Sequence, residues 1–140
     1  MIPNDPLAPA AAPPLPPPPT STQRTQCVLA HALALLGPVA WLIGIVVPGV
    51  NVIGPLILHG MLDSPSPLVR GHTAHSVNFQ LLAALIGIPL TLLTFSTAGR
   101  VVVWIIALLW LALVARAIHQ AAVGRPWKPP LSLPLARSTL

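Results

Sequence analysis

The residues that could carry chemistry in this sequence are histidines and amides, because carboxylates are almost missing. The only two acids are Asp5 and Asp63, and the chain has no glutamate. Paired-carboxylate catalysis and most carboxylate metal sites therefore lack the groups they need. No phosphate-binding glycine loop, serine nucleophile elbow or His-Glu-x-x-His motif is present either. We expect a chain that is not an enzyme and that holds no cofactor.

Two histidines have a spacing that suits a metal site. His72 and His75 are three residues apart and would share one face of a helix. A stable site needs a third or fourth ligand, which only another histidine or Asn78 could supply. Hydrogen bonds between helices are therefore favoured over a metal at this pair. The same interhelical role is predicted for Asn78 and Gln80, whose amides stand at the entry of an apolar stretch.

Three further histidines lie inside or close to apolar stretches. An imidazole in such a place could be an axial ligand of haem or of a chlorin pigment. The chain lacks the C-x-x-C-H haem-attachment motif, so a hydrogen bond to a neighbouring helix is favoured, and His31 joins the predicted interhelical positions. The pigment alternative stays open. The histidines concerned are His31, His59 and His119.

The composition of the chain is that of a membrane protein. Apolar residues make up 54% of its 140 residues and charged residues 6%, whereas soluble domains have about 25% charged residues. The net charge of +5 could suggest nucleic acid, but the basic residues are dispersed and form no run. They lie near the ends of apolar stretches, where they and a tryptophan can anchor among lipid headgroups. The predicted anchors are Arg70, Arg116, Arg125, Trp127 and Lys128.

Prolines and apolar runs divide the chain into a tail, a membrane domain and a second tail. Nine of the first 20 residues are proline, which supplies no backbone donor, so residues 1–26 are predicted to be a disordered tail. Residues 125–140 are predicted to be an extended tail. Between the tails, residues 27–124 are predicted to form an all-α integral membrane bundle of three to four helices. The expected helices are 28–47, 51–62, 68–96 and 100–123.

The first helical unit of this bundle is predicted to be broken. Gly37-Pro38 should kink it and Pro48-Gly49 should end it, after which Asn51 can cap a short second helix. The second helix, 51–62, rises only about 18 Å, which is less than the thickness of the hydrocarbon core.

Two topologies are compatible with this break. In the favoured one, four segments cross the bacterial cytoplasmic (inner) membrane and both termini are cytoplasmic, because most basic residues then lie inside. In the other, the first two segments form one re-entrant unit, which leaves three crossings.

Four short segments, taken in their order along the chain, resemble a known family. It comprises small bacterial membrane proteins of uncharacterised function related to the Tic subunit of chloroplast inner-envelope import, and the resemblance covers about residues 29–135. At Ala74 and His75 the chain departs from that family, which often has Lys and Glu there. The resemblance implies a multi-helix membrane protein, with translocation only by analogy. The segments are Gly54-Pro55-Leu56-Ile57, Ser66-Pro67-Leu68-Val69-Arg70-Gly71-His72, Asn78-Phe79-Gln80 and Gly124-Arg125-Pro126-Trp127.

Two functions follow as hypotheses. The first is an accessory or scaffold subunit of a larger membrane complex without catalysis, which the few charges and the two extended tails favour. Its partners would be the lipid bilayer and other membrane-protein subunits, or further copies of the chain, and no nucleic acid. The alternative is a subunit of a polypeptide- or solute-conducting pathway, which the Tic-like resemblance and the broken first unit favour.

Overall fold

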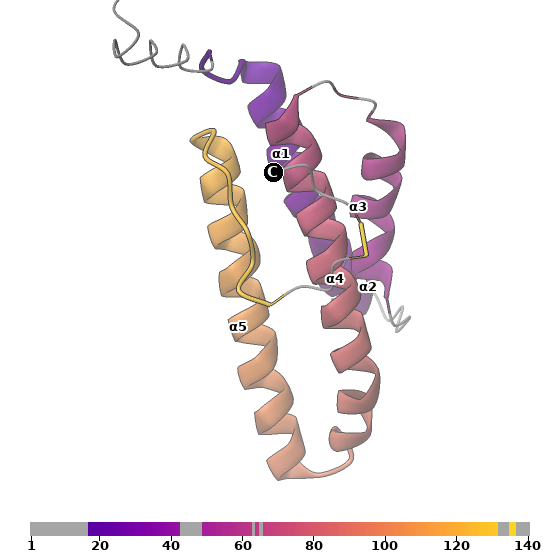
Figure 1. The fold of residues 1–140 in the computed structure, drawn as a ribbon. Coiled ribbons are helices and arrows are strands. Elements are labelled where there is room, and N and C mark those ends of the chain that lie inside the picture. Colours follow the sequence, from indigo (N-terminus) through magenta and orange to yellow (C-terminus); the bar gives the residue numbers. More distant parts are fainter. Residues whose placement is uncertain (1–16, 43–48, 63, 65, 132–134, 137–140) are drawn as a thin grey trace, which may run out of the picture.

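The computed structural model describes residues 17–42, 49–62, 64, 66–131 and 135–136, and over these residues the protein is helical without any strand. The predicted all-α class is confirmed. Figure 1 shows the first helices descending behind α4, α3 returning beside them, and α4 and α5 forming a longer antiparallel pair. The predictions for residues 1–16, 43–48, 63, 65, 132–134 and 137–140 lie outside the described part of the chain.

The first helix, α1 (Ser21–Ala32), begins inside the stretch predicted to be a disordered tail. A capping box explains this start. The Gln23 N–H donates to Thr20 Oγ1 at 3.2 Å, and the Thr20 N–H donates to Gln23 Oε1 at 2.9 Å. Thr-x-x-Gln is the sequence signal for such a cap, so helix replaces the predicted tail over residues 21–26.

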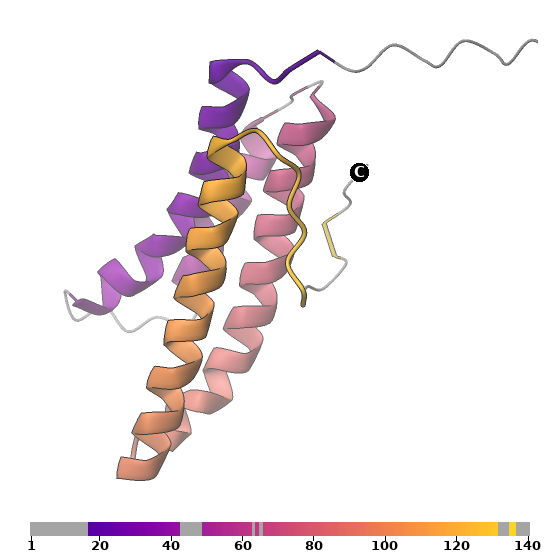
Figure 2. The ribbon, with the colours of Figure 1, turned by 90° about the vertical axis from the view of Figure 1, so that its left-hand side faces the viewer.

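The break in the first helical unit is a short 3-10 helix, η1 (Leu33–Leu35), which leads into α2 (Leu36–Leu42). Pro38 has no amide hydrogen and its ring excludes the carbonyl of Ala34, so the α-helical bond cannot form there. The tighter 3-10 turn lies directly before this position. Figure 2 shows that the chain then leans away from the long axis of α4 and α5.

The short helix α3 (Val50–Met61) begins after Gly49, whose φ of 87° lies in the left-handed region. Asn51 is not the cap that the sequence suggests, because its side chain bonds to Gln80 of α4 instead. α3 packs against α4 and η1. Gly54 permits the second contact, since a Cβ at this position would lie 2.7 Å from Leu33 Cβ.

The two long helices are α4 (Pro67–Leu93) and α5 (Thr97–Ala122), and both are long and apolar enough to cross a membrane. Pro67 occupies the first turn of α4, where its missing N–H disturbs no helical bond. At the turn between the helices, Ser96 Oγ caps α5 by accepting from the Gly99 N–H at 3.0 Å. We call this end of the pair the turn end, and the opposite end, where α4 begins and α5 finishes, the termini end.

A Schellman motif stops α5 at the termini end. Gly124 has a φ of 72°, its N–H donates to the Ala121 carbonyl at 3.0 Å, and the Arg125 N–H donates to the Gln120 carbonyl at 2.9 Å. The chain then reverses as a non-helical stretch that passes along α4 (Figure 2). We call residues 125–136 the C-terminal segment and describe its residues 125–131 and 135–136.

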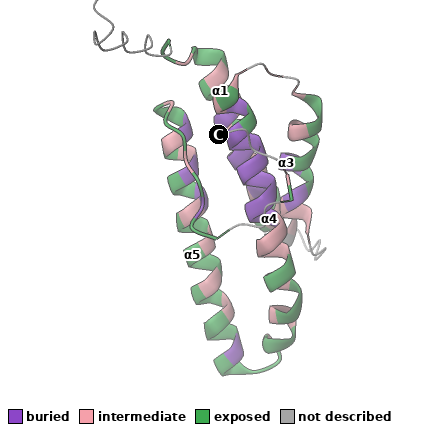
Figure 3. Cartoon of the chain, in the orientation of Figure 1, coloured by how far each residue is buried: buried purple, intermediate pink, exposed green. Residues whose placement is uncertain are grey.

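Burial divides the α4–α5 pair into two halves, as Figure 3 shows. Towards the termini end, residues 71–80 of α4 are all buried beneath neighbours that include α1 and α3. Towards the turn end, residues 81–93 are exposed or half-buried. A small apolar cluster of Cys27, Val69 and Ala121 lies at the core near the termini end.

Candidate functional site: a buried polar network on α4

The buried half of α4 carries many polar side chains. Burying a polar group without a partner costs roughly 2–7 kcal/mol, so the hydrogen-bond partners of these side chains show what holds the helices together. We call the set the α4 polar network. Its members are His72, Thr73, His75, Ser76, Asn78 and Gln80.

His31 and His72 form a chain of hydrogen bonds from α1 across α4 to the end of α5. His31 Nε2 lies 3.0 Å from His72 Nδ1, and His72 Nε2 lies 3.0 Å from the carbonyl oxygen of Arg125. A carbonyl only accepts, so the hydrogen of a neutral His72 ring is on Nε2 and its Nδ1 accepts from His31. Both His72 nitrogens are then engaged, which leaves no lone pair for a metal.

Asn78 holds the C-terminal segment against α4. Its Nδ2 donates to the Ala136 carbonyl at 2.8 Å, and its Oδ1 accepts from the N–H groups of Leu135 and Ala136 at 3.0 and 2.6 Å. One amide side chain thereby satisfies three backbone groups of a non-helical stretch that has no helix of its own to satisfy them.

Gln80 is the member of the network nearest the turn end, and it joins α4 to α3 and α5. Its Oε1 accepts from Asn51 Nδ2 of α3 at 2.8 Å and from Trp110 Nε1 of α5 at 2.9 Å. An indole N–H only donates, which fixes the orientation of the Gln80 amide. Gln80 Nε2 is consequently buried with no acceptor among the described residues.

Ser76 and Thr73 tie α4 to α1 and α3. Ser76 Oγ donates to the Ala30 carbonyl of α1. Thr73 Oγ1 donates to the Arg70 carbonyl and lies 2.9 Å from His59 Nδ1 of α3, so this ring nitrogen is the donor. The network therefore connects α4 to α1, α3, α5 and the C-terminal segment.

Comparison with known families shows where this arrangement belongs. Residues 22–136 match the family described as the magnetosome magnetite crystal formation protein family. The chain belongs to this family. No curated protein and no solved structure matches the sequence. Membership in the magnetosome family supports a membrane-associated protein of magnetosome formation.

The family match overturns the resemblance to Tic-related proteins. Three of the four quoted segments have general structural roles: Gly54 allows a close helix contact, Pro67 starts a helix and Gly124 ends one. Many helical membrane proteins need such devices, so their order does not separate one family from another. With the Tic-like resemblance gone, the conducting pathway loses its main support.

The structure places the five predicted interhelical residues at buried positions of α1 and α4. Four of them bond to another helix or to the C-terminal segment, and the fifth, His75, has no hydrogen bond among the described residues. The sequence offered no signal for Trp110 as a partner of Gln80, because a tryptophan in an apolar helix is usually a packing residue. Asn51 was obscured by its position near a helix start, where a cap is the default interpretation.

The histidines of the metal and pigment alternatives all lie in the described part of the chain. No group of three or more His, Cys, Asp or Glu is placed there to hold a metal ion. The rings of His31 and His72 bond to each other, and His119 lies exposed on α5. His59 bonds to Thr73.

The predicted membrane anchors differ in how far they are buried. Arg70, Arg116, Arg125 and Lys128 are exposed. Trp127 is half-buried, and its ring lies edge-on to His31 with the ring centres 5.8 Å apart. It therefore also packs over the His31–His72 pair, a contact that the anchor prediction does not include.

Proposed function

We propose that this magnetosome-family protein is a non-catalytic accessory subunit that packs against other membrane proteins, or against copies of itself, in the bacterial cytoplasmic membrane. In this proposal the helices form a multi-pass bundle with a broken first unit, and both termini are cytoplasmic. The observation that carries the proposal is the exposed apolar surface of the α4–α5 pair near its turn end. Phe95 is 88% exposed, Trp104 68% and Leu108 62%.

That surface needs an apolar covering. Soluble monomers rarely expose a large contiguous apolar patch, whereas membrane helices present such a surface to lipid and to neighbouring helices. The exposed side chains continue along one face of α5 through Leu111, four and three residues apart, which is the pattern of a packing face.

The polar half of the molecule supports a structural role. Its side chains hydrogen-bond mostly to one another and to backbone carbonyls, and these bonds hold the helices together. A direct role in binding iron is not favoured, because hard cations take oxygen ligands, above all carboxylates. The chain has two acidic residues and a net charge of +5, which repels cations.

Gentle detergent extraction followed by native co-purification and mass spectrometry tests the proposal. We expect extraction only with detergent, together with a stoichiometric partner or a defined homo-oligomer. A monomer without any stoichiometric partner under gentle conditions would contradict the accessory role. Recovery in the soluble fraction would contradict membrane residence.

A matched pair of variants localises the packing face. Replacement of Trp104, Leu108 and Leu111 by alanine keeps α5 apolar but removes its protruding side chains, so the partner or oligomer should be lost. The control replaces Ile53, Leu56 and Ile57 of α3, which are also exposed, and should leave the assembly intact. Loss of assembly in the control alone would place the interface on α3 and refute the assignment to α5.

A further inference from the structure

The depth that α3 reaches along the long helices can be read from its hydrogen bonds. Asn51, at the start of α3, donates to Gln80 Oε1, and Trp110 donates to the same oxygen. Gln80 is the middle residue of α4 (Pro67–Leu93), and Trp110 lies at the middle of α5 (Thr97–Ala122). The lower end of α3 therefore lies at half the height of the α4–α5 pair.

The end of the first helical unit lies near the same level. A Cβ at Gly37 would be 3.0 Å from Asn51 Cβ, so α2 passes α3 at the height of Asn51. Beyond this crossing α2 leans outwards, and Figures 1 and 2 both show it ending well above the turn between α4 and α5.

Only α4 and α5 continue to the turn end among the described residues. Residues 81–93 of α4 rise about 20 Å beyond Gln80 at 1.5 Å per residue. Their side chains are exposed or half-buried. The molecule is thus broad towards the termini end and narrow towards the turn end, as Figure 3 shows.

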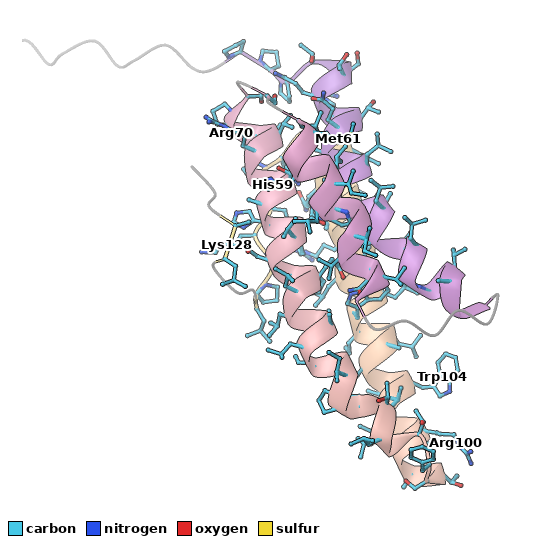
Figure 4. The ribbon with its side chains drawn as sticks, turned by 90° about the vertical axis from the view of Figure 1, so that its right-hand side faces the viewer. His59, Met61, Arg70, Arg100, Trp104 and Lys128 are labelled. Atoms are coloured by element: carbon cyan, nitrogen blue, oxygen red, sulfur yellow. The ribbon has the colours of Figure 1, made fainter. Side chains whose placement is uncertain are left out.

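Charged side chains mark where a bilayer would lie along this shape. Arg100 stands near the turn end, and Arg70 near the termini end (Figure 4). Along α5, Arg100 and Arg116 are separated by about 24 Å at 1.5 Å per residue, which matches a hydrocarbon core of about 30 Å when arginine side chains extend to the headgroups. Trp110 is about 9 Å from Arg116 and about 15 Å from Arg100 on this scale.

From these positions we infer that α2 and α3 enter only the leaflet on the termini side, and that the protein is a wedge which favours membranes where this leaflet is convex. In that leaflet the first helical unit and α3 stand beside α4 and α5. In the opposite leaflet only α4 and α5 displace lipid, among the described residues. Each helix with its side chains is about 10–12 Å wide, so the two cross-sections differ by about a factor of two.

The preference follows from lipid packing. A body that occupies more area in one leaflet expands that leaflet, and outward curvature of the same leaflet relieves the mismatch. The protein would therefore act on the shape of a lipid surface, or sort to curved regions of it. This activity goes beyond the accessory role. It depends on membrane residence and is inferred for the chain alone, without a partner on the turn-end half of α5.

Orientation in vesicles of different diameter tests the wedge. The full chain is reconstituted into phosphatidylcholine–phosphatidylglycerol vesicles, with a fluorophore at the N-terminus and an impermeant quencher outside. Because the outer leaflet of a small vesicle is strongly convex, the fraction of molecules with outward termini should rise as the diameter falls. The same fraction at every diameter would overturn the inference. A fluorophore at Ala98→Cys, in a Cys27→Ala background, reports the turn end and should give the complementary fraction.

Depth measurement tests the geometry separately. A polarity-sensitive probe at Ile53→Cys on α3 and another at Leu92→Cys on α4 are compared by quenching with lipids brominated at known depths. The Ile53 probe should be quenched best by deep bromines, and the Leu92 probe by bromines near the headgroups. An Ile53 probe at the headgroups opposite the termini would mean that α3 spans the bilayer, and would overturn the wedge. Failure of the protein to reconstitute at all would instead refute membrane residence.

Discussion

At the scale of single residues, the His31–His72 pair is the most consequential contact in the polar network. It joins α1 to α4, and through the Arg125 carbonyl it also fixes the end of α5. Two facing imidazoles can hydrogen-bond only when one donates and the other accepts, so the contact requires a neutral acceptor ring. The pair therefore holds α1 against α4 only when one ring donates and the other accepts.

A double-mutant cycle measures this contact. Replacement of His31 and His72 by alanine, singly and together, should give a coupling free energy of about 0.6–2 kcal/mol, the range for hydrogen bonds between membrane helices. Reversible unfolding in mixed detergent micelles provides the free energies. His119→Ala serves as the control, because His119 is exposed and its loss should leave stability unchanged. Additive effects of the two substitutions would show that the rings do not interact.

Metal addition is a second test at this scale. Both ring nitrogens of His72 are occupied by hydrogen bonds, so the His72 and His75 pair offers no complete site. We expect Zn²⁺ and chelators to leave the melting temperature of the purified protein unchanged. Stabilisation by Zn²⁺ that disappears in His75→Ala would show that the pair opens to bind metal.

At the scale of elements, close approach of η1 and α3 depends on a missing side chain. A Cβ at Gly54 would lie 2.7 Å from Leu33 Cβ and 3.0 Å from the Leu33 carbonyl oxygen. We expect Gly54→Ala to lower the free energy of unfolding by about 1–3 kcal/mol, because overpacking forces the backbones apart.

Gly60 of α3 provides the matched control for this prediction. A Cβ at Gly60 would meet nothing within 4 Å. Gly60→Ala should therefore stabilise the helix by up to about 1 kcal/mol through helix propensity alone. Equal effects of the two substitutions, measured by the same unfolding assay, would contradict the close contact.

The attachment of the C-terminal segment to α4 belongs to the same scale. Asn78→Ala removes three hydrogen bonds to Leu135 and Ala136. The amides of these two residues should then exchange faster with deuterium, because Asn78 Oδ1 is their acceptor within the described part of the chain. Asn51→Ala, which disturbs α3 instead, should leave their exchange rates unchanged. Unaltered exchange in Asn78→Ala would show that the segment is held elsewhere.

At the scale of the whole molecule, the distribution of charge predicts the orientation. Arg70, Arg116 and Arg125 belong to the half at the termini end, whereas Arg100 stands by the turn. Because cytoplasmic segments of membrane proteins are enriched in basic residues, both termini should be cytoplasmic. A green fluorescent protein fused to the C-terminus should fluoresce in cells, and an alkaline phosphatase fused after Ala98 should be active. The reverse pattern would refute this orientation.

The family assignment also belongs to the scale of the whole molecule, because the match covers most of the chain. Three of the four segments that suggested a Tic-related protein serve a close helix contact, a helix start and a helix end, whereas Asn78-Phe79-Gln80 supplies hydrogen bonds to distant residues. Short motifs of this kind predict elements well and ancestry poorly. Comparison over residues 22–136 uses the whole pattern, so it corrects what the motifs suggested.

The sequence by itself determined the helical class and the approximate helices, because apolar runs, prolines and glycines act locally. It also indicated His31 and Gln80 as interhelical residues, since buried polar side chains need partners. Asn78 was predicted to bond to a helix as well, but its partner is the C-terminal segment. The partners themselves were decided only by the tertiary structure. Trp110 and Asn51, which bond to Gln80, each lie about 30 positions from it along the chain. The depth of α3, which reaches half the height of α4, follows from how the helices cross. Such contacts join distant parts of the chain, and no local rule specifies them.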